Sequence, residues 1–219
     1  MMKTTLLGLA AALLTAGCST VGVRSGTEEP AYTVVERIGE VEIRRYGPRI
    51  AAQTVVTGSG EAARNRGFQR LAGYIFGGNT SRSSIAMTAP VAQVPETGGP
   101  DGSRSIAMTA PVAQGPAGAD RWVIQFFMPA SWTMQTLPIP RDPAVTLVEL
   151  PTETYAVLRF SGLGGAPTIA ARQADLAAAL QAQAWVADGE PVVWFYDPPW
   201  TVPPLRRNEV AVRVTGTAR

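Results

Sequence analysis

Short runs of alternating apolar and polar residues, separated by glycine and proline, make up most of the chain after residue 31. Residues 32–58 contain three such runs, with breaks at Gly39 and at Gly47–Pro48. Alternation with a period of two indicates strands, and glycine and proline commonly end them. The same pattern predicts further strands in RWVIQFFMP (121–129), in two runs within 145–164, and in PVVWFYD and NEVAVRV near the end of the chain.

Two segments have a different apolar spacing. Residues 61–76 (EAARNRGFQRLAGYIF) place their larger apolar side chains three and four positions apart, and two glycines follow. Residues 167–185 (PTIAARQADLAAALQAQAW) show the same spacing. This is the period of an amphipathic helix, and glycine is a common residue at a helix end. We therefore expect two helices among the predicted strands.

A faint internal repeat relates two parts of the chain at an offset of 104 residues. VEIRRYGPRIAAQTVVTGSG (41–60) aligns with VTLVELPTETYAVLRFSGLG (145–164), so that their last two glycines coincide. In both copies a strand–turn–strand pattern precedes a predicted helix. We therefore expect an α+β domain, a distorted antiparallel β-barrel of two pseudo-symmetric strand–strand–helix–strand–strand halves with two flanking helices. The halves cover about 31–128 and 144–215.

The decapeptide SIAMTAPVAQ occurs twice, at 84–93 and 105–114, with turn residues between the copies. Its apolar positions alternate, so we expect the copies to form the two arms of one hairpin. Met87 and Met108 are the residue type of a soft-metal site. In an antiparallel hairpin, however, the two sulfurs would lie on the order of 10 Å apart. We expect both methionines to pack in the core or a pocket.

The first 18 residues have the pattern of an export signal. A positive charge precedes an apolar run at 6–14 that is too short to span a bilayer, and two small residues precede Cys18. This resembles a bacterial lipobox, in which the cysteine is lipidated, although Thr15 stands where Leu is usual. The lipobox implies a membrane anchor at Cys18, and Ser19 favours the periplasmic face of the outer membrane. An ordinary signal peptide with a coincidental cysteine is the alternative.

Charge and missing residue types narrow the function of the rest of the chain. Residues 19–30 are small and polar and predict a flexible tether, with the folded domain at 31–215. Without the one lysine of the signal, 18 arginines face 17 acidic residues, so we expect no nucleic-acid partner. There is no histidine, which excludes Ser-His-Asp catalysis, helical zinc motifs and His-ligated haem. Cys18 is the single cysteine, so the domain has no thiol nucleophile.

Several motifs together resemble the SOUL haem-binding protein family. They are YIFGGN, the doubled I-x-MTAPV, YDPP and RRNE, at Tyr74–Asn79, Ile85–Val91, Ile106–Val112, Tyr196–Pro199 and Arg206–Glu209. The resemblance covers roughly residues 29–214. It implies a barrel-like α+β domain of two halves that binds haem or another tetrapyrrole, in several members through a hydrophobic cleft.

The loop 197–207 (DPPWTVPPLRR) is the candidate wall of such a cleft. Its four prolines reduce the entropy that is lost when a ligand binds. Trp200 offers a flat apolar face to a macrocycle, and Arg206 and Arg207 offer planar donors to carboxylates. A solvated strand start is the alternative for the two arginines.

The resemblance places the cleft between this loop and the first helix, so Arg64, Phe68 and Leu71 become candidate lining residues. Plain core packing is the alternative for Phe68 and Leu71. Because no histidine is present, haem would be held by apolar contacts, by arginines on its propionates, or by a Met or Tyr ligand such as Tyr46, Met87 or Met108. For these three, too, core packing is the alternative.

We therefore expect a lipid-anchored, non-enzymatic envelope protein that holds a small planar amphipathic ligand, haem or another tetrapyrrole, in an apolar cleft. Two alternatives stay open. One is an envelope structural or interaction lipoprotein without a small ligand. The other is a hydrolase of small substrates that uses carboxylate and tyrosine side chains, which rests on fold analogy alone.

Overall fold

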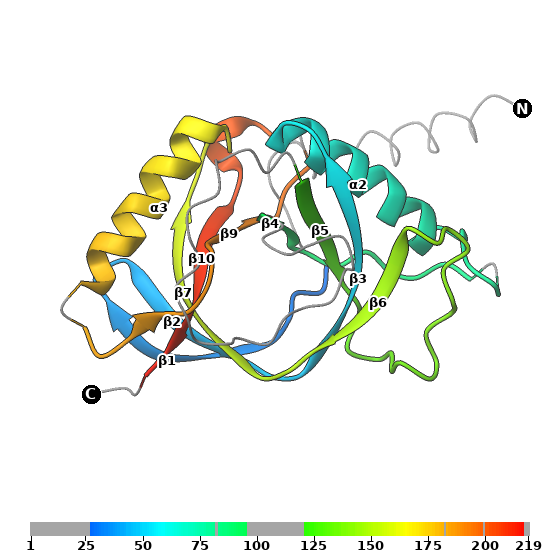
Figure 1. The fold of residues 1–219 in the computed structure, drawn as a ribbon, viewed down its shortest axis with the longest axis horizontal. Coiled ribbons are helices and arrows are strands. Elements are labelled where there is room, and N and C mark those ends of the chain that lie inside the picture. Colours follow the sequence, from blue (N-terminus) through cyan, green and yellow to red (C-terminus); the bar gives the residue numbers. More distant parts are fainter. Residues whose placement is uncertain (1–26, 82, 96–120, 182, 199, 217–219) are drawn as a thin grey trace, which may run out of the picture.

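A computed structural model describes residues 27–81, 83–95, 121–181, 183–198 and 200–216. One strongly curved sheet carries two long helices on its convex side (Figure 1). The strands are β1 (Tyr32–Ile38), β2 (Val41–Tyr46), β3 (Arg49–Thr57), β4 (Val91–Pro95), β5 (Arg121–Phe127), β6 (Val145–Leu150), β7 (Glu153–Phe160), β8 (Val186–Ala187), β9 (Val192–Phe195) and β10 (Asn208–Thr215). The helices are α2 (Gly60–Ile75), α3 (Ala166–Leu180) and the short 3-10 helix η1 (Pro203–Leu205). Within these ranges, no helix has the length and hydropathy needed to cross a membrane.

Most of the predicted elements are confirmed. The first three strands break where expected, and Gly39 in the first turn has a φ of 58°, a conformation that favours glycine. Helix α2 matches its prediction to within a residue at each end. Helix α3 ends five residues before the predicted end because Gln181 has extended backbone. The chain then turns so that the ring of Trp185 is buried and its Nε1 donates to Glu36 at 2.8 Å.

The predicted α+β fold with an antiparallel sheet and two helices is confirmed, but the sheet is open, so the predicted distorted barrel is wrong. Its order is β1-β2-β7-β10-β9-β4-β5-β3-β6, with antiparallel strand pairing throughout. Among the described strands, β1 pairs only with β2 and β6 pairs only with β3. Tyr32 of β1 and Glu149 of β6 both line one cleft. A cleft, and not a hydrogen-bond ladder, therefore separates the two edges.

The offset of 104 residues returns in the strand pairing. In the β2–β7 ladder Val41 faces Leu158, and in the β6–β3 ladder Val145 faces Thr54. Val145 lies 104 positions after Val41, and Leu158 lies 104 positions after Thr54, so the two ladders have the same register. If β1 is left out, equivalent positions can be read from the two ends of the strand order inward. β2 then corresponds to β6, β7 to β3, β10 to β5, and β9 to β4.

The first decapeptide copy does not form the predicted hairpin arm. Strand β4 begins only at Val91, and its two edges are taken by β5 and β9. The residues before it are held at the end of α2, where the Ile85 N–H donates to the Ile75 carbonyl at 2.8 Å. Met87 is 37% exposed, so its predicted core or pocket packing is also wrong. The second copy, with Met108, lies outside the described residues.

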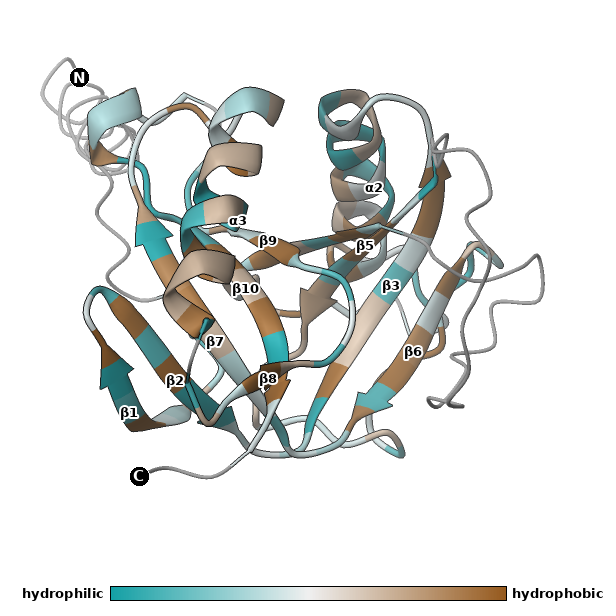
Figure 2. Ribbon diagram, turned by 60° about the vertical axis from the view of Figure 1, so that its left-hand side comes forward, coloured by the Kyte–Doolittle hydropathy of each residue, from teal (hydrophilic) through white to brown (hydrophobic). Residues whose placement is uncertain are grey.

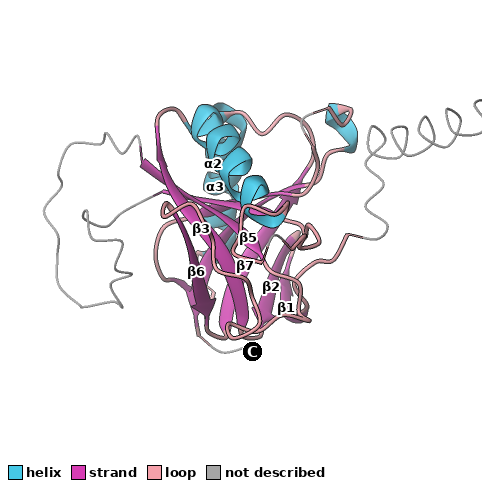
Figure 3. Cartoon of the chain, turned by 90° about the vertical axis from the view of Figure 1, so that its right-hand side faces the viewer, coloured by secondary structure: helices cyan, strands magenta, loops and turns pink. Residues whose placement is uncertain are grey.

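Alternation along the strands divides the side chains between two faces. On the convex face, aliphatic side chains pack beneath α2 and α3 in two clusters. Strand β10 is typical, because Val210 and Val212 lie beneath α3 whereas Ala211 belongs to the concave cluster. Figure 2 shows the alternating hydrophobic and hydrophilic bands on the strands, and in Figure 3 both helices lie toward the top of the molecule, with most of the strands below them.

Candidate ligand-binding sites

A buried ion network lies on the concave face of the sheet. Glu209 of β10 has no exposed surface. Its carboxylate accepts hydrogen bonds from Arg44 on β2 at 2.9 and 3.2 Å and from Arg207 at 2.9 and 3.0 Å. The hydroxyl of Tyr196 donates to it at 2.7 Å. The remaining terminal nitrogen of Arg207, Nη1, donates to both carboxylate oxygens of Glu29 at 3.0 and 3.1 Å. Positive and negative side chains therefore alternate along the network.

Burial and charge act in opposite directions on the arginines of this network. Burial disfavours the charged guanidinium of Arg44, but the facing carboxylate of Glu209 outweighs it, and the pKa of Arg44 is raised. The pKa of Arg207 is raised in the same way. Burial, together with the negative charge of Glu209, raises the pKa of Tyr196. Both arginines therefore stay charged and Tyr196 stays neutral, which keeps the hydrogen bonds in their observed direction.

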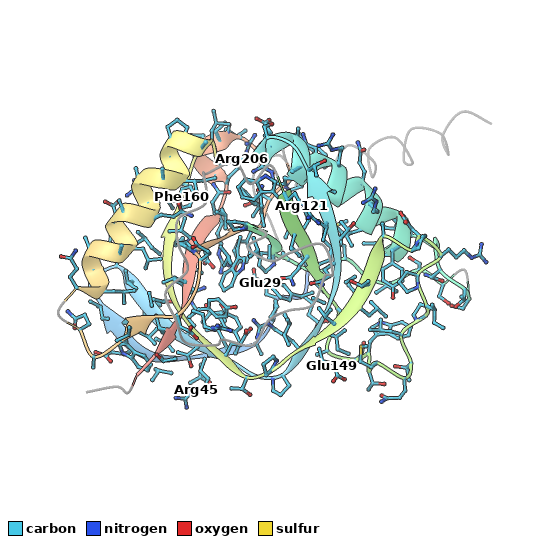
Figure 4. The ribbon with its side chains drawn as sticks, in the orientation of Figure 1. Glu29, Arg45, Arg121, Glu149, Phe160 and Arg206 are labelled. Carbon is cyan, nitrogen blue, oxygen red and sulfur yellow. The ribbon has the colours of Figure 1, made fainter. Side chains whose placement is uncertain are left out.

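Aromatic rings fill the space around this network. Tyr46, Tyr155 and Trp194 form mutual ring contacts with centroids 5.3–6.1 Å apart. The guanidinium of Arg207 lies 3.7 Å above the ring of Tyr196. Glu29 lies inside the ring of strands (Figure 4). The centre of the curved sheet is therefore packed with side chains.

A large cleft opens beside this packed centre. It has a volume of about 970 Å³, within the range of small-molecule sites. Its walls come from the segment 28–33, the β2–β3 turn, the loop 127–135 and the β6–β7 turn, together with Thr88 before β4. Two residues of its lining, Arg45 and Glu149, lie at the edge of the molecule away from the helices (Figure 4).

The predicted site lies on the other side of the sheet, at the convex face. Arg206 lies near the ends of α2 and α3 (Figure 4), and its Nε donates to the Thr201 carbonyl at 2.7 Å. The guanidinium of Arg64 lies 4.0 Å above the ring of Phe195 in β9. Phe68, one helical turn from Arg64, packs edge-on against Phe126 while its own side chain reaches the surface.

Arg64 and Arg206 interact electrostatically. Burial lowers the pKa of Arg64, and the positive charge of Arg206 lowers it further, against the opposing effect of Glu61. The Arg64 guanidinium lies above the aromatic ring and is repelled by the charge of Arg206, and a bound anion would relieve that repulsion. The arrangement is therefore suited to a ligand with an apolar body and acidic groups.

The structure places the six predicted lining residues in three environments. Leu71 has no exposed surface and belongs to the core beneath α2, so its predicted place in a cleft wall is wrong. Arg207, predicted to offer donors to a ligand carboxylate, instead pairs with Glu209 and Glu29 in the concave network. Arg64 and Arg206 are close enough to interact electrostatically, whereas Phe68 and Trp200, the latter 62% exposed, contribute apolar surface from α2 and the loop.

The structure also shows residues that sequence reasoning missed. Phe195 is one of them. It follows Trp194 in the strand, so alternation places its side chain on the opposite face of the sheet from Trp194, and this pattern could have identified it. The pairing of Arg44 with Glu209 is another, since these residues are 165 positions apart. Of the possible iron ligands, Tyr46 is buried among aromatic rings and Met87 lies at the surface. Cys18 lies outside the described residues.

An open antiparallel sheet with two helices on its convex side defines the class of α+β domain to which the chain belongs. The model of the SOUL haem-binding protein family matches residues 27–213. The chain therefore belongs to this family.

Individual proteins are similar to the chain in sequence or in fold. Haem-binding protein 2 of Mus musculus is 36% identical over 88 residues, which are 36% of this chain and 43% of that protein. The aligned part of the chain thus spans less than half the length of that relative. The C-terminal domain of EcmrR has a TM-score of 0.56 at 8% identity, covering 85% of this chain and 99% of that domain. An uncharacterized conserved protein from Listeria innocua has a TM-score of 0.53 at 10% identity, covering 87% and 94%. At these identities the two structures show the fold alone.

Proposed function

We propose that the protein binds haem or a related tetrapyrrole at the convex face, between α2 and the loop 197–207. Its membership of the SOUL family and its similarity to mouse haem-binding protein 2 support a haem ligand. The observation that carries the choice of surface is the guanidinium of Arg64 above the ring of Phe195, together with the nearby positive charge of Arg206. Planar guanidiniums suit the bidentate binding of carboxylates such as haem propionates.

The macrocycle would rest on apolar surface that the arginines border. Phe68 and Trp200 have exposed side chains in this region, and Phe195 is partly buried. Apolar contact and propionate pairing then supply the binding energy, and no axial histidine takes part because the chain has none. We infer a non-enzymatic binder, held at the periplasmic face of the outer membrane through a lipid on Cys18. An envelope interaction protein without a small ligand is the competing proposal.

The proposed surface draws on both halves of the domain, which we infer to be related by a pseudo-two-fold axis. The equal register of the β2–β7 and β6–β3 ladders supports this relation. Arg64 and Phe68 come from the half that contains α2, and Phe195 and Arg206 come from the half that contains α3. A ligand on this surface would therefore bridge the two halves.

Titration of the purified protein with haemin, followed by the Soret band and by tryptophan fluorescence, tests this proposal. Trp200→Ala should weaken binding by about 1–3 kcal/mol without unfolding the domain. Arg206→Ala should weaken haemin more than a haem whose propionates are esterified. Arg172→Ala, on the exposed side of α3, is the matched control. Saturation with unchanged affinity in both loop variants would place the ligand elsewhere, and the lack of any spectral change at micromolar haemin would remove haem altogether.

A further inference from the structure

We propose that the cleft of about 970 Å³ beside the packed centre is a second binding site, which takes a neutral amphipathic molecule with an alcohol or carbonyl oxygen on an apolar body. The site does not depend on haem binding, because its lining includes neither Arg64 nor Arg206. Three observations carry it: the apolar walls of the cleft, an unpaired donor at its inner end, and the charges of its lining.

The walls of the cleft suit an apolar body. Aromatic and thioether side chains line it, together with the aliphatic ends of β3 and β6 and several prolines. Aromatic faces and prolines form rigid walls that lose little entropy when a ligand is bound. The larger apolar side chains of the lining include Tyr32, Ile50, Phe127, Met128, Trp132 and Met134.

Arg49 supplies the unpaired donor. Its side chain is nine-tenths buried, and one terminal nitrogen donates to Glu153 at 2.9 Å. Its Nε is buried and has no hydrogen-bond acceptor among the residues that the structure describes. A buried donor without an acceptor is costly, so an oxygen placed there by a ligand would stabilise the complex.

A small cavity connects Arg49 with the larger cleft. It holds about 10 Å³, the room that a single oxygen atom needs. Glu29, Tyr32, Arg49 and Phe127 line both spaces, so the cavity continues the cleft toward the packed centre. The oxygen of a ligand would occupy the cavity while its apolar body filled the cleft.

The charges of the lining favour a neutral ligand. Glu28, Glu29 and Glu149 line the cleft against Arg45 and Arg49. Glu29 lines the same small cavity as Arg49. A carboxylate bound at Arg49 would therefore lie near the carboxylate of Glu29, and the two like charges would repel each other. An ammonium group offers no acceptor to the Nε–H and would face a guanidinium. A hydroxyl or carbonyl oxygen accepts the hydrogen bond and adds no charge.

Three pyrene probes that differ only in their head group test the ligand class. Pyrenemethanol, pyrenecarboxylate and pyrenemethylammonium are titrated separately into the full chain, and pyrene fluorescence together with tryptophan quenching reports binding. Pyrenemethanol should bind about ten-fold more tightly than either charged probe. Equal or tighter binding of the carboxylate, tighter binding of the ammonium, or no binding of pyrenemethanol would overturn the proposal.

Two variants test the site itself. Arg49→Lys keeps a cation for Glu153 but puts carbon in the place of Nε, so pyrenemethanol should bind about ten-fold more weakly. Thr33→Trp fills the cleft from the exposed edge strand β1, and it should abolish binding even if Arg49→Lys proves too unstable to measure. Unchanged affinity in Thr33→Trp would overturn the site.

Two controls separate this proposal from the one for haem. Trp200→Ala and Arg206→Ala, on the convex face, should leave pyrenemethanol affinity unchanged, and Arg49→Lys should leave haemin affinity unchanged. The two sites can then fail independently. If pyrenemethanol competes with haemin for one site, the second site does not exist.

Discussion

The two faces of the same sheet are built from different kinds of residue. On the convex face, aliphatic side chains such as Leu158 and Leu176 pack against helices. On the concave face, rings such as Tyr155 and Trp194 surround ion pairs, and none of the helices contributes to the buried cluster. Neighbouring residues of a single strand serve both faces, as Glu209 and Val210 do in β10. The sheet thus separates a core held by apolar burial from one held by matched charges.

This difference decides which substitutions each face tolerates. An aliphatic core loses stability in proportion to the side-chain volume that is removed. It also loses stability when an added atom clashes with its neighbours. A buried charge network fails when any one partner is lost, because the remaining charges stay buried without a counter-ion. Substitutions on the two faces should therefore change the free energy of unfolding by different amounts.

Loss of the Glu209 charge should have the largest effect. Glu209→Gln leaves Arg44 and Arg207 facing a neutral amide, and we expect the free energy of unfolding to fall by about 3–5 kcal/mol. Urea unfolding followed by circular dichroism measures it. Glu149→Gln, at an exposed position of β6, is the matched control and should change stability by less than about 0.5 kcal/mol. If the two variants lose equal stability, the concave network does not hold the fold.

The next largest loss of stability is expected where an added side-chain atom would clash on the convex face. A Cβ at Gly67 of α2 would lie 2.3 Å from Cγ1 of Ile124, so Gly67→Ala should cost about 1–3 kcal/mol although alanine is the better helix former. Gly73 lies in the same helix, and a Cβ there would meet no atom within 4 Å. Gly73→Ala should therefore stabilise the protein by about 0.5–1 kcal/mol. Thermal unfolding of the two variants should move in opposite directions, and parallel shifts would show that Ile124 gives way.

The sequence predicted the convex face better than the concave one, for a physical reason. Helix α2 and the strands under it follow from apolar periods that are local in the chain. The pairing of Arg44 with Glu209 joins residues 165 positions apart, and no local pattern predicts which distant charge an arginine meets. Arg207 shows the consequence, because its neighbour Arg206 lies on the convex side while Arg207 enters the network. Alternation predicts that two adjacent residues point to opposite faces, but it does not predict which of them points to the concave face.

The decapeptide shows a second limit of local patterns. Its alternation predicted a strand from Ile85, yet the chain there bonds to the end of α2 and becomes a strand only at Val91. Period-two alternation describes extended backbone, and extended backbone does not by itself provide a pairing edge. Since β5 and β9 occupy both edges of β4, tertiary structure decided where the strand began.

Alkaline pH offers a smaller test, on the convex side. Burial raises the pKa of Tyr74 to about 12, and its hydroxyl donates to the Pro138 carbonyl at 2.8 Å. An unfolded tyrosine loses its proton near pH 10, so between about pH 10 and 12 the folded state binds more protons and stability falls as the pH rises.

Tyr74→Phe should cost about 1 kcal/mol at neutral pH, where the hydrogen bond is lost, and less as the pH approaches 12. Urea unfolding at a series of pH values measures the difference between variant and wild type. Tyr46 and Tyr196 also have raised pKa values, so both proteins still lose stability at alkaline pH. A constant difference across this range would show that Tyr74 titrates normally.

An exposed ion pair on the convex side gives the smallest expected effect and the sharpest contrast. Arg172 donates to Asp175 at 3.1 Å on α3, where both side chains are about half exposed. Water and salt screen such a pair, so Asp175→Ala should change the free energy of unfolding by no more than about 0.5 kcal/mol. The pair joins the same kinds of group, at nearly the same distance, as Arg44 and Glu209. If urea unfolding showed similar losses for Asp175→Ala and Glu209→Gln, burial would not be what separates the faces; a several-fold difference would assign the stability of the concave network to desolvated charge.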